Sequence, residues 1–157
     1  MPGHSPALSV KGRALRLLAQ REHTRTELER KLRQRLREQP EALAQIGPAL
    51  DALAAAGLLS DRRAADALAT AQSRRFGDAR VRFTMRSRGL GDEHIRDALA
   101  TLPGTELSRA REIWQRRFGG APATDVVERV RQARFLAGRG FSSETIRRVV
   151  RGLSDPD

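Results

Sequence analysis

Apolar residues recur along most of this chain at intervals of three and four, the spacing that places side chains on one face of an α-helix. The clearest example lies within residues 92–102. Its apolar face comprises Ile95, Ala98, Leu99 and Leu102. Glycines close many of these periodic segments, as is typical of helix ends, because glycine adopts the left-handed backbone conformation at little cost. The pattern predicts an all-α protein.

The middle third of the chain reads as three helices separated by glycines. Residues 61–75 contain helix formers throughout, and either Ser60 or Asp61 can cap their start. This helix stops at “FG”, where we expect Gly77 to take the left-handed cap. A second segment runs to Gly89, and the amphipathic segment described above follows it.

The second of these segments is ambiguous. In “ARVRFTMR”, residues 79–86, apolar residues alternate with arginine, which is the pattern of a strand. The segment is short and the sequence offers no second strand to pair with it, so we favour a helix. In that helix Val81 and Met85 face the core and Phe83 lies off that face.

The last third repeats this plan with a longer middle helix. We expect a first helix over residues 105–118, ended by “GG”. Its core-facing side chains are predicted to be Leu107, Ala110, Ile113 and Trp114. A second helix is expected over residues 124–137, ended by Gly140, and Ser142 caps a third. The apolar face of the second helix is predicted to comprise Val126, Val127, Val130, Ala133 and Phe135.

The first third fits the plan more loosely. The segment “TRTELERKL” begins with the capping box Thr24-x-x-Glu27, a specific sign of a helix start. Pro48 stands at a favourable first position for a later helix, which stops at Gly57. The segment “REQPEALAQIG” precedes that proline, with room for a short helix of its own.

Parts of the sequence occur twice. “RRFG” is found at 74–77 and 116–119, and “RGLGDEHIR” at 88–96 matches “RGFSSETIR” at 139–147 in five of nine positions. A three-helix unit of this size buries too little surface to be stable alone, so neighbouring units are expected to stack. The sequence therefore predicts three tandem three-helix repeats in an elongated, curved array. The predicted units are residues 13–60, 61–103 and 104–153, with a disordered N-terminal tail over 1–12 and a C-terminal tail over 154–157.

The charge pattern narrows the choice of partners. The 157 residues carry a formal net charge of +11, and of the 30 basic side chains only Lys11 and Lys31 are lysine. The excess is +4, +3 and +4 over residues 1–60, 61–103 and 104–157, so it is not confined to one basic arm. A GC-rich genome would produce the arginine bias by itself. The alternative is a polyanionic partner, because the guanidinium fork pairs with phosphate or carboxylate.

Eleven arginines are the candidates for such contacts. Those of “RRFG” end the first helices of their units, where a cation also stabilises the helix C-terminus. Those of the second helices have few acids beside them, and Arg82 and Arg86 are like-charge neighbours at i,i+4. A solvated basic face is the competing interpretation. The partner- or phosphate-binding candidates are Arg74, Arg75, Arg80, Arg82, Arg86, Arg88, Arg116, Arg117, Arg129, Arg131 and Arg134.

Catalytic, metal and cofactor sites are not expected. His4, His23 and His94 are scattered without metal-ligand spacing, and His23, beside a helix cap, is expected to be a capping or surface residue. The adjacent acids Asp92 and Glu93 fit a helix N-terminus, where the dipole favours negative charge. No P-loop or dinucleotide fingerprint is present, so we predict that the protein is not an enzyme.

The cellular compartment follows from further absences in the sequence. Without cysteine, disulfides and thiolate metal sites are excluded. No run of 18 apolar residues predicts a membrane span, and the first residues lack the apolar core of a signal peptide. A cytoplasmic location is the default expectation.

Several of these motifs resemble the bacterial RecX family of regulatory proteins. “REHTRTELERKL”, “GLLSD”, the “RRFG…RVRFTMRSRGL” run and “FLAGRGFSSETIRRVV” stand in the family's order from about Ala14 to Val150. The resemblance implies three tandem three-helix repeats. It also implies binding to the RecA recombinase filament on single-stranded DNA, with inhibition of filament extension, ATP turnover and strand exchange. The implied roles are recombination, DNA repair and the SOS response, without enzyme activity.

The alternative is a direct nucleic-acid-binding protein that uses its three-helix units like a helix-turn-helix. Such a reader would present asparagine or glutamine to base edges, but this chain has no asparagine and its glutamines are scattered. Weak, sequence-independent contact with the phosphates of single-stranded DNA fits the composition better. We expect a monomer.

Overall fold

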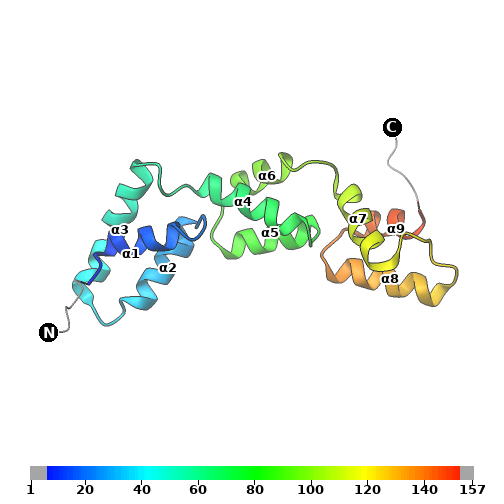
Figure 1. The fold of residues 1–157 in the computed structure, drawn as a ribbon, viewed down its shortest axis with the longest axis horizontal. Coiled ribbons are helices and arrows are strands. Elements are labelled where there is room, and N and C mark those ends of the chain that lie inside the picture. The colour runs from blue at the N-terminus through cyan, green and yellow to red at the C-terminus, as the bar shows by residue number, and fades with distance from the viewer. Residues whose placement is uncertain (1–6, 153–157) are drawn as a thin grey trace.

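The computed structural model describes residues 7–152, and that part of the chain forms nine α-helices and no strand. Figure 1 shows them as an elongated, curved array, as expected. The helices are α1 Val10–Leu18, α2 Arg25–Arg35, α3 Pro40–Ala55, α4 Asp61–Ser73, α5 Asp78–Ser87, α6 Asp92–Ala100, α7 Glu106–Phe118, α8 Val126–Gly138 and α9 Ser143–Val150. The all-α prediction is confirmed.

The helices pack in three consecutive groups of three, α1–α3, α4–α6 and α7–α9, each with its own apolar core. Leucines fill the first core, smaller residues such as Ala65 and Ala69 the second, and Trp114 and Phe141 the third. The groups form an arch whose concave side carries the second helix of each group, α2, α5 and α8 (Figure 1). The limits of the three predicted units stay a prediction, and residue 153 and the tail over 154–157 lie outside the described residues.

Most of the predicted helix starts are confirmed. The Thr24–Glu27 capping box is formed, with Thr24 Oγ1 3.0 Å from the amide of Glu27. Ser60, and not Asp61, caps α4, and Ser142 caps α9. The ambiguous segment is the helix α5. In it Val81 and Met85 are fully buried, whereas Phe83 is 73% exposed.

The predicted N-terminal tail is too long. The helix α1 already begins at Val10, and the hydroxyl of Ser9 accepts a hydrogen bond from the amide of Gly12 at 3.0 Å. Val10 is buried in the first core, so packing orders this end of the helix. Residues 1–6 of the expected tail lie outside the described residues.

The predicted start of α3 at Pro48 is wrong, because Pro40 takes the first helical position and Pro48 lies inside the helix. A proline there removes one backbone hydrogen bond, at a cost of about 3 kcal/mol. The carbonyl left without that bond belongs to Ala44, which is exposed to water. Burial of Ile46 and Leu50 on the opposite side of the helix favours continuation through the proline.

The predicted apolar face of α8 is wrong in part. Val126, Val127 and Val130 are 64%, 80% and 42% exposed, while Gln132 and Leu136 are buried. The Gln132 carbonyl oxygen accepts a hydrogen bond from the indole nitrogen of Trp114 at 2.8 Å. A buried indole N–H needs such an acceptor. Since Val130 and Gln132 stand about 200° apart around the helix, only one of them can face the core.

The duplicated “RG” turn joins each group of helices to the one before it. The amide of Gly77, just before α5, donates a hydrogen bond to the carbonyl of Arg139 at 2.8 Å. The hydroxyl of Thr24, just before α2, likewise donates to the carbonyl of Arg88 at 2.5 Å. Each turn therefore docks beside the start of a second helix in the preceding group. The first group has no “RG” pair in its sequence.

The glycines at these junctions allow the backbones to approach closely. Gly89 and Gly140 have φ of 81° and 85°, which confirms the expected left-handed caps. The same prediction for Gly77 is wrong, because its φ is −74° and it precedes α5 as the N-cap. Glycine is needed there for space, since a Cβ atom would lie 2.5 Å from the carbonyl carbon of Gly140 and 2.5 Å from the amide nitrogen of Phe141.

His23 is not the capping or surface residue expected, because it is 1% exposed. Its Nδ1 lies 2.9 Å from the carbonyl of Arg21, and its Nε2 lies 3.0 Å from Nζ of Lys31. A neutral ring fits both partners, with Nδ1–H donating and Nε2 accepting. Burial lowers the pKa of His23 from its usual 6.5, the hydrogen bond with Arg21 opposes that shift, and the charges of Arg21 and Lys31 add to it.

Ion pairs close to His23 span the first junction. Glu27 pairs with Arg21 in its own group and, at 3.6 Å, with Arg88 of the second group. Burial acts to raise the pKa of Glu27, but its hydrogen bond with Arg21 and the charges of Arg21 and Arg88 hold that pKa below its usual 4.5. Glu27 is therefore ionised at neutral pH, and Arg88 helps to hold two groups of helices together.

Candidate phosphate-binding arginine cluster

The two copies of “RRF” meet where the second and third groups of helices adjoin. In the first copy Arg74 and Arg75 follow the last residue of α4. In the second copy Arg116 and Arg117 form the last turn of α7, which Gly119 ends in the left-handed conformation, with φ of 75°. The two copies of the motif therefore differ in local structure, yet both arginine pairs lie at the junction of the second and third groups.

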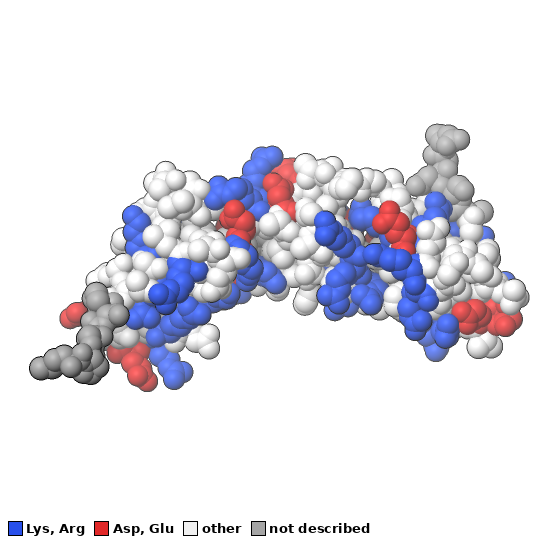
Figure 2. All heavy atoms as spheres, in the orientation of Figure 1, with Lys and Arg blue, Asp and Glu red and all other residues white. Residues whose placement is uncertain are grey.

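These four arginines line a hollow of about 300 Å³. The residues around it are Arg74, Arg75, Ile113, Arg116, Arg117, Phe135 and Arg139. We call its five arginines the arginine cluster. No acidic side chain lines the hollow. Figure 2 shows basic side chains gathering on the concave side of the arch where the second and third groups adjoin.

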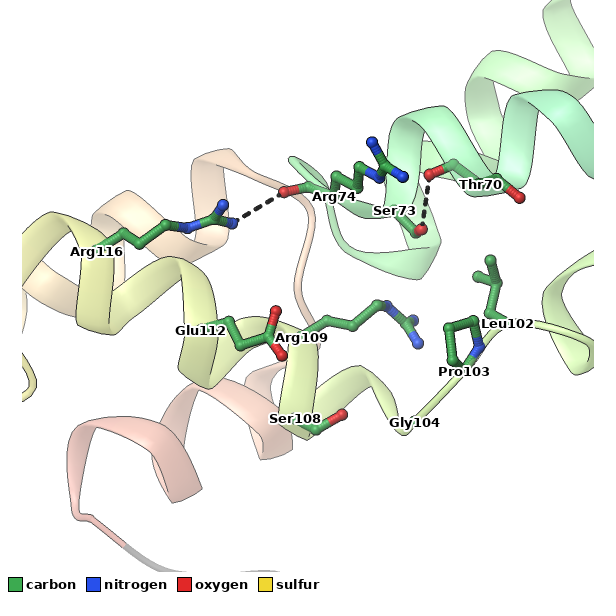
Figure 3. Close-up of a pocket in the computed structure, with 10 residues that line it drawn as sticks. All are labelled: Thr70, Ser73, Arg74, Leu102, Pro103, Gly104, Ser108, Arg109, Glu112 and Arg116. Carbon is green, nitrogen blue, oxygen red and sulfur yellow. Dashed lines mark hydrogen bonds between the residues drawn. The ribbon is translucent and has the colours of Figure 1, made fainter.

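Backbone carbonyl groups hold two members of the arginine cluster across the junction. Nη2 of Arg116 donates to the carbonyl of Arg74 at 3.3 Å, a contact that can be followed in Figure 3. Nη1 of Arg139 donates to the carbonyl of Arg75 at 3.4 Å. Each guanidinium has five N–H donors, so these single bonds leave most donors available for a ligand.

Phenylalanine rings support the guanidinium groups. Arg75 and Arg139 lie over the ring of Phe76, at 5.4 and 5.6 Å from its centroid. Arg117 lies 5.8 Å from the centroid of Phe135, and Arg139 lies 5.2 Å from it. Such stacking uses the flat face of a guanidinium and leaves its N–H edge free to bind a planar or tetrahedral anion.

The arginine cluster carries positive charge that no ion pair within the described residues balances. Among the residues that the structure describes, none of its five members forms an ion pair. By contrast, Arg109 at the same junction pairs with Asp78. Like charges gathered without counter-charge repel one another, and a bound anion would relieve that repulsion. The geometry therefore suits phosphate or carboxylate groups.

A second hollow, of about 330 Å³, adjoins the cluster and shares Arg74 and Arg116 with it (Figure 3). Hydroxyl groups and Glu112 also line it, and Nε of Arg109 is buried there without a hydrogen-bond partner. The carboxylate of Glu112 makes this hollow less suited to an anion than the cluster. Over residues 7–152 the structure contains no group of acidic and histidine side chains arranged to hold a metal ion.

The other predicted arginines of α5 serve different purposes. Arg80 stacks on Phe76 at 4.1 Å and donates to the carbonyl of Gly138 at 3.0 Å, so it joins the second and third groups. Arg86 pairs with Asp92 at 3.2 Å, and both side chains are exposed. Arg82 is exposed, and Arg88 belongs to the first junction described above.

The predicted arginines of α8 do not line the hollow of the arginine cluster. Arg131 pairs with Glu128 at 3.1 Å and lies over the ring of Phe118 at 5.3 Å. Arg129 and Arg134 border a groove between α8 and α9. The eleven candidates are thus divided among several places, of which the cluster is the densest. Sequence reasoning missed Arg139, although its place in the duplicated “RG” motif was a usable signal.

Comparison with known proteins supports the repeat architecture and identifies relatives. The sequence model described as “RecX, third three-helix domain” matches residues 105–150. The chain is 47% identical to the Regulatory protein RecX of Leptothrix cholodnii over 96% of this chain and 93% of that protein. It is 43% identical to the Regulatory protein RecX of Pseudomonas entomophila over 92% of each.

Solved structures share the fold. The crystal structure of RecX from Lactobacillus salivarius superposes with a TM-score of 0.70, covering 92% of this chain and 94% of that one at 19% identity. A second structure, of a regulatory protein RecX, gives a TM-score of 0.68 at 24% identity and covers 89% of this chain and 70% of the other. At these identities the likeness establishes the three-dimensional arrangement of the helices.

Proposed function

The chain belongs to the RecX family of regulatory proteins, and from that premise we propose that it binds the RecA recombinase filament on single-stranded DNA and restrains it. It blocks filament extension, ATP turnover and strand exchange, and so regulates recombination, DNA repair and the SOS response. It acts in the cytoplasm as a monomer. It performs no chemistry of its own, in keeping with relatives that are named regulatory proteins.

The observation that carries this proposal is the arginine cluster. It is assembled from two groups of helices at their junction, and Figure 2 shows basic side chains gathering on the concave side of the arch where those groups adjoin. A nucleoprotein filament presents acidic side chains and DNA phosphates, and both pair bidentately with arginine. An arch seated along such a filament contacts neighbouring subunits at once, and thereby opposes the movements that extension and turnover require.

Composition supports a partner that is not read by sequence. A protein that recognises one DNA sequence presents amide side chains to base edges, and this chain has no asparagine. Contacts from arginine to phosphate position a protein on DNA without specifying sequence. The filament proposal therefore fits better than a repressor that reads one duplex site.

The test is the ATPase activity of the cognate RecA on single-stranded DNA, measured with increasing amounts of this protein. We expect turnover to fall with dose, and filaments seen by electron microscopy to become shorter. Unchanged turnover and unchanged filament length at saturating, folded protein would refute the proposal. Binding to bare DNA, measured in parallel without RecA, separates a filament regulator from a simple DNA-coating protein.

A further inference from the structure

The groove between α8 and α9 has the properties of an interaction surface. Its volume is about 510 Å³, and it is lined by Val126, Arg129, Val130, Ala133, Arg134, Ala137, Ser143, Ile146, Arg147, Val150 and Arg151. Val126 and Val130, which the sequence pattern assigned to the core, are 64% and 42% exposed at this groove. Contiguous exposed apolar surface with a polar rim is typical of binding sites.

The apolar floor of the groove is long and straight. On α8 it follows Val126, Val130, Ala133 and Ala137, at spacings of four, three and four residues. The eleven residue steps from Val126 to Ala137 span about 16 Å, which is about three turns of a partner helix. Ile146 and Val150 of α9, one turn apart, form the other wall. A groove with two apolar walls of this kind suits an amphipathic helix, which binds through its own apolar residues at positions i, i+3, i+4 and i+7.

The rim of the groove specifies the charge of the partner. Arg129 and Arg134 stand on α8, Arg147 stands on α9, and Arg151 is the C-cap of α9. No acidic side chain lines the groove, and none of the four forms an ion pair in the part of the chain that the structure describes. A partner helix with acids on both flanks of its apolar stripe would pair with both sides. A second copy of this chain, at +11, carries the wrong charge.

The second group lacks the apolar floor of this groove. Counted back from Gly140 and Gly89, Ala133 and Ala137 of α8 stand where α5 has Arg82 and Arg86. In the second group, arginines therefore occupy the equivalent floor. Counted from the same glycines, α8 also begins three residues earlier than α5, and that added turn carries Val126. Both differences open and lengthen an apolar groove in the third group.

We propose that the α8–α9 groove binds an acidic amphipathic helix of a protein partner, with apolar residues on the floor and carboxylates against the four arginines. The proposal does not depend on the recombinase, and its test contains none. The partner helix completes a four-helix arrangement with the three helices of the third group. A nucleic-acid backbone is disfavoured as the occupant, because its phosphates would face valine and alanine on the floor.

The probe is a fluorescent 16-residue peptide of leucine, alanine and glutamate, with leucines at helical i, i+4, i+7 and i+11 positions and glutamates on both flanks. Binding is measured by anisotropy on the full chain, and its location by NMR amide shifts. The control peptide has the same composition in scrambled order. We expect saturable binding, shifts confined to α8 and α9, and at least tenfold weaker binding of the scrambled peptide.

Matched variants test the floor of the groove. Val126→Ser with Val130→Ser removes apolar floor residues, and we expect at least tenfold weaker binding. Val127→Ser is the control, because Val127 is the neighbouring valine, is 80% exposed and does not line the groove. Serine and valine have similar helix propensities, so all three substitutions leave the fold intact. Ala133→Arg with Ala137→Arg gives α8 the residues of α5 and should abolish binding.

Several outcomes would overturn the proposal. One is equal binding of the ordered and scrambled peptides, and another is a set of shifts at the arginine cluster in place of the groove. A third is a truncation after Gly152 that raises peptide affinity tenfold, which would assign the groove to the chain's own last residues. Self-association that Val126→Ser and Val130→Ser abolish would assign it to a second copy.

Discussion

Gly77 and Gly91 offer a matched test of how the groups of helices are joined. Both are N-caps, of α5 and α6, with φ and ψ of −74° and 166° at Gly77 and −76° and 161° at Gly91. They differ in their surroundings. Nothing lies within 4 Å of a Cβ atom built at Gly91, whereas one at Gly77 meets the backbone of the Gly140 turn.

The expected effects follow from that difference. At Gly91 alanine loses some N-cap preference but restricts the unfolded chain, and the two effects leave the free energy of unfolding within about 0.5 kcal/mol of wild type. At Gly77 the same two effects apply, and the Cβ atom also overlaps backbone atoms, which cannot rotate away as a side chain would. Overpacking of this kind adds about 1–3 kcal/mol, and it acts on the contact between the second and third groups.

Trp114 makes the effect on the third group measurable. It is the only tryptophan in the chain and is buried in the third core, so its fluorescence reports that group. Circular dichroism at 222 nm reports all the helices. In urea, Gly77→Ala should lower the fluorescence midpoint by about 1 M relative to Gly91→Ala, and separate it from the circular dichroism midpoint. Equal fluorescence midpoints for the two variants would refute the role assigned to the Gly77–Gly140 contact.

Three further predictions concern pH, DNA and shape. Between about pH 7.5 and 5.5 the free energy of unfolding should fall, because His23 has a lower pKa when folded and the unfolded chain takes up the proton first. In urea titrations, His23→Gln should make the free energy of unfolding less dependent on pH in this range, and an unchanged pH dependence would contradict the role of His23. Glu27 does not contribute there, because the stabilisation from its lowered pKa is lost only below the usual value of 4.5. Binding to single-stranded DNA should be weak, with a log–log salt slope near −3 for about four phosphates, and tight binding to one duplex sequence at physiological salt would contradict it. The radius of gyration from small-angle scattering should exceed the roughly 15 Å of a compact 157-residue protein, and a value near 15 Å would contradict the arch.

The fold could be predicted from local signals because each helix carries its own. The capping box at Thr24, the cap at Ser142 and the left-handed glycines at Gly89 and Gly140 all act within a few residues of the chain. Even α5, with its strand-like alternation, follows from the need to bury Val81 and Met85 on one face. The repeats in the sequence then indicated the tandem arrangement.

Two of the errors share a cause, which is a contact with a residue distant in the sequence. Gly77 is a glycine because of the Gly140 turn, and α8 turns Gln132 inward because Trp114 needs an acceptor. His23 is a different case, because Arg21 and Lys31, which contact its ring, lie two and eight residues away, yet its place beside a helix cap suggested a surface position. Pattern within one helix cannot reveal such partners.

The sequence allowed most residues of the candidate site to be predicted, but not which of them lie together in the fold. The two “RRF” copies were visible in the sequence, yet nothing in it showed that Arg74, Arg75, Arg116 and Arg117 line one hollow. That depends on the junction of the second and third groups, which also brings in Arg139. At the same junction Arg80, which was predicted to bind a partner, donates a hydrogen bond to the carbonyl of Gly138 and so joins the two groups.

The central claim is that two groups of helices build one arginine site that restrains the recombinase. Its most direct test compares Arg75→Glu plus Arg117→Glu with Arg16→Glu plus Arg62→Glu, four arginines that are all exposed and of which only the first two belong to the cluster. Both variants change the net charge equally, and circular dichroism should show both folded. In the single-stranded-DNA-dependent ATPase assay of the cognate RecA, the control pair should inhibit as wild type does. The cluster pair should need at least ten times more protein for the same inhibition, and equal inhibition by both variants would contradict the account.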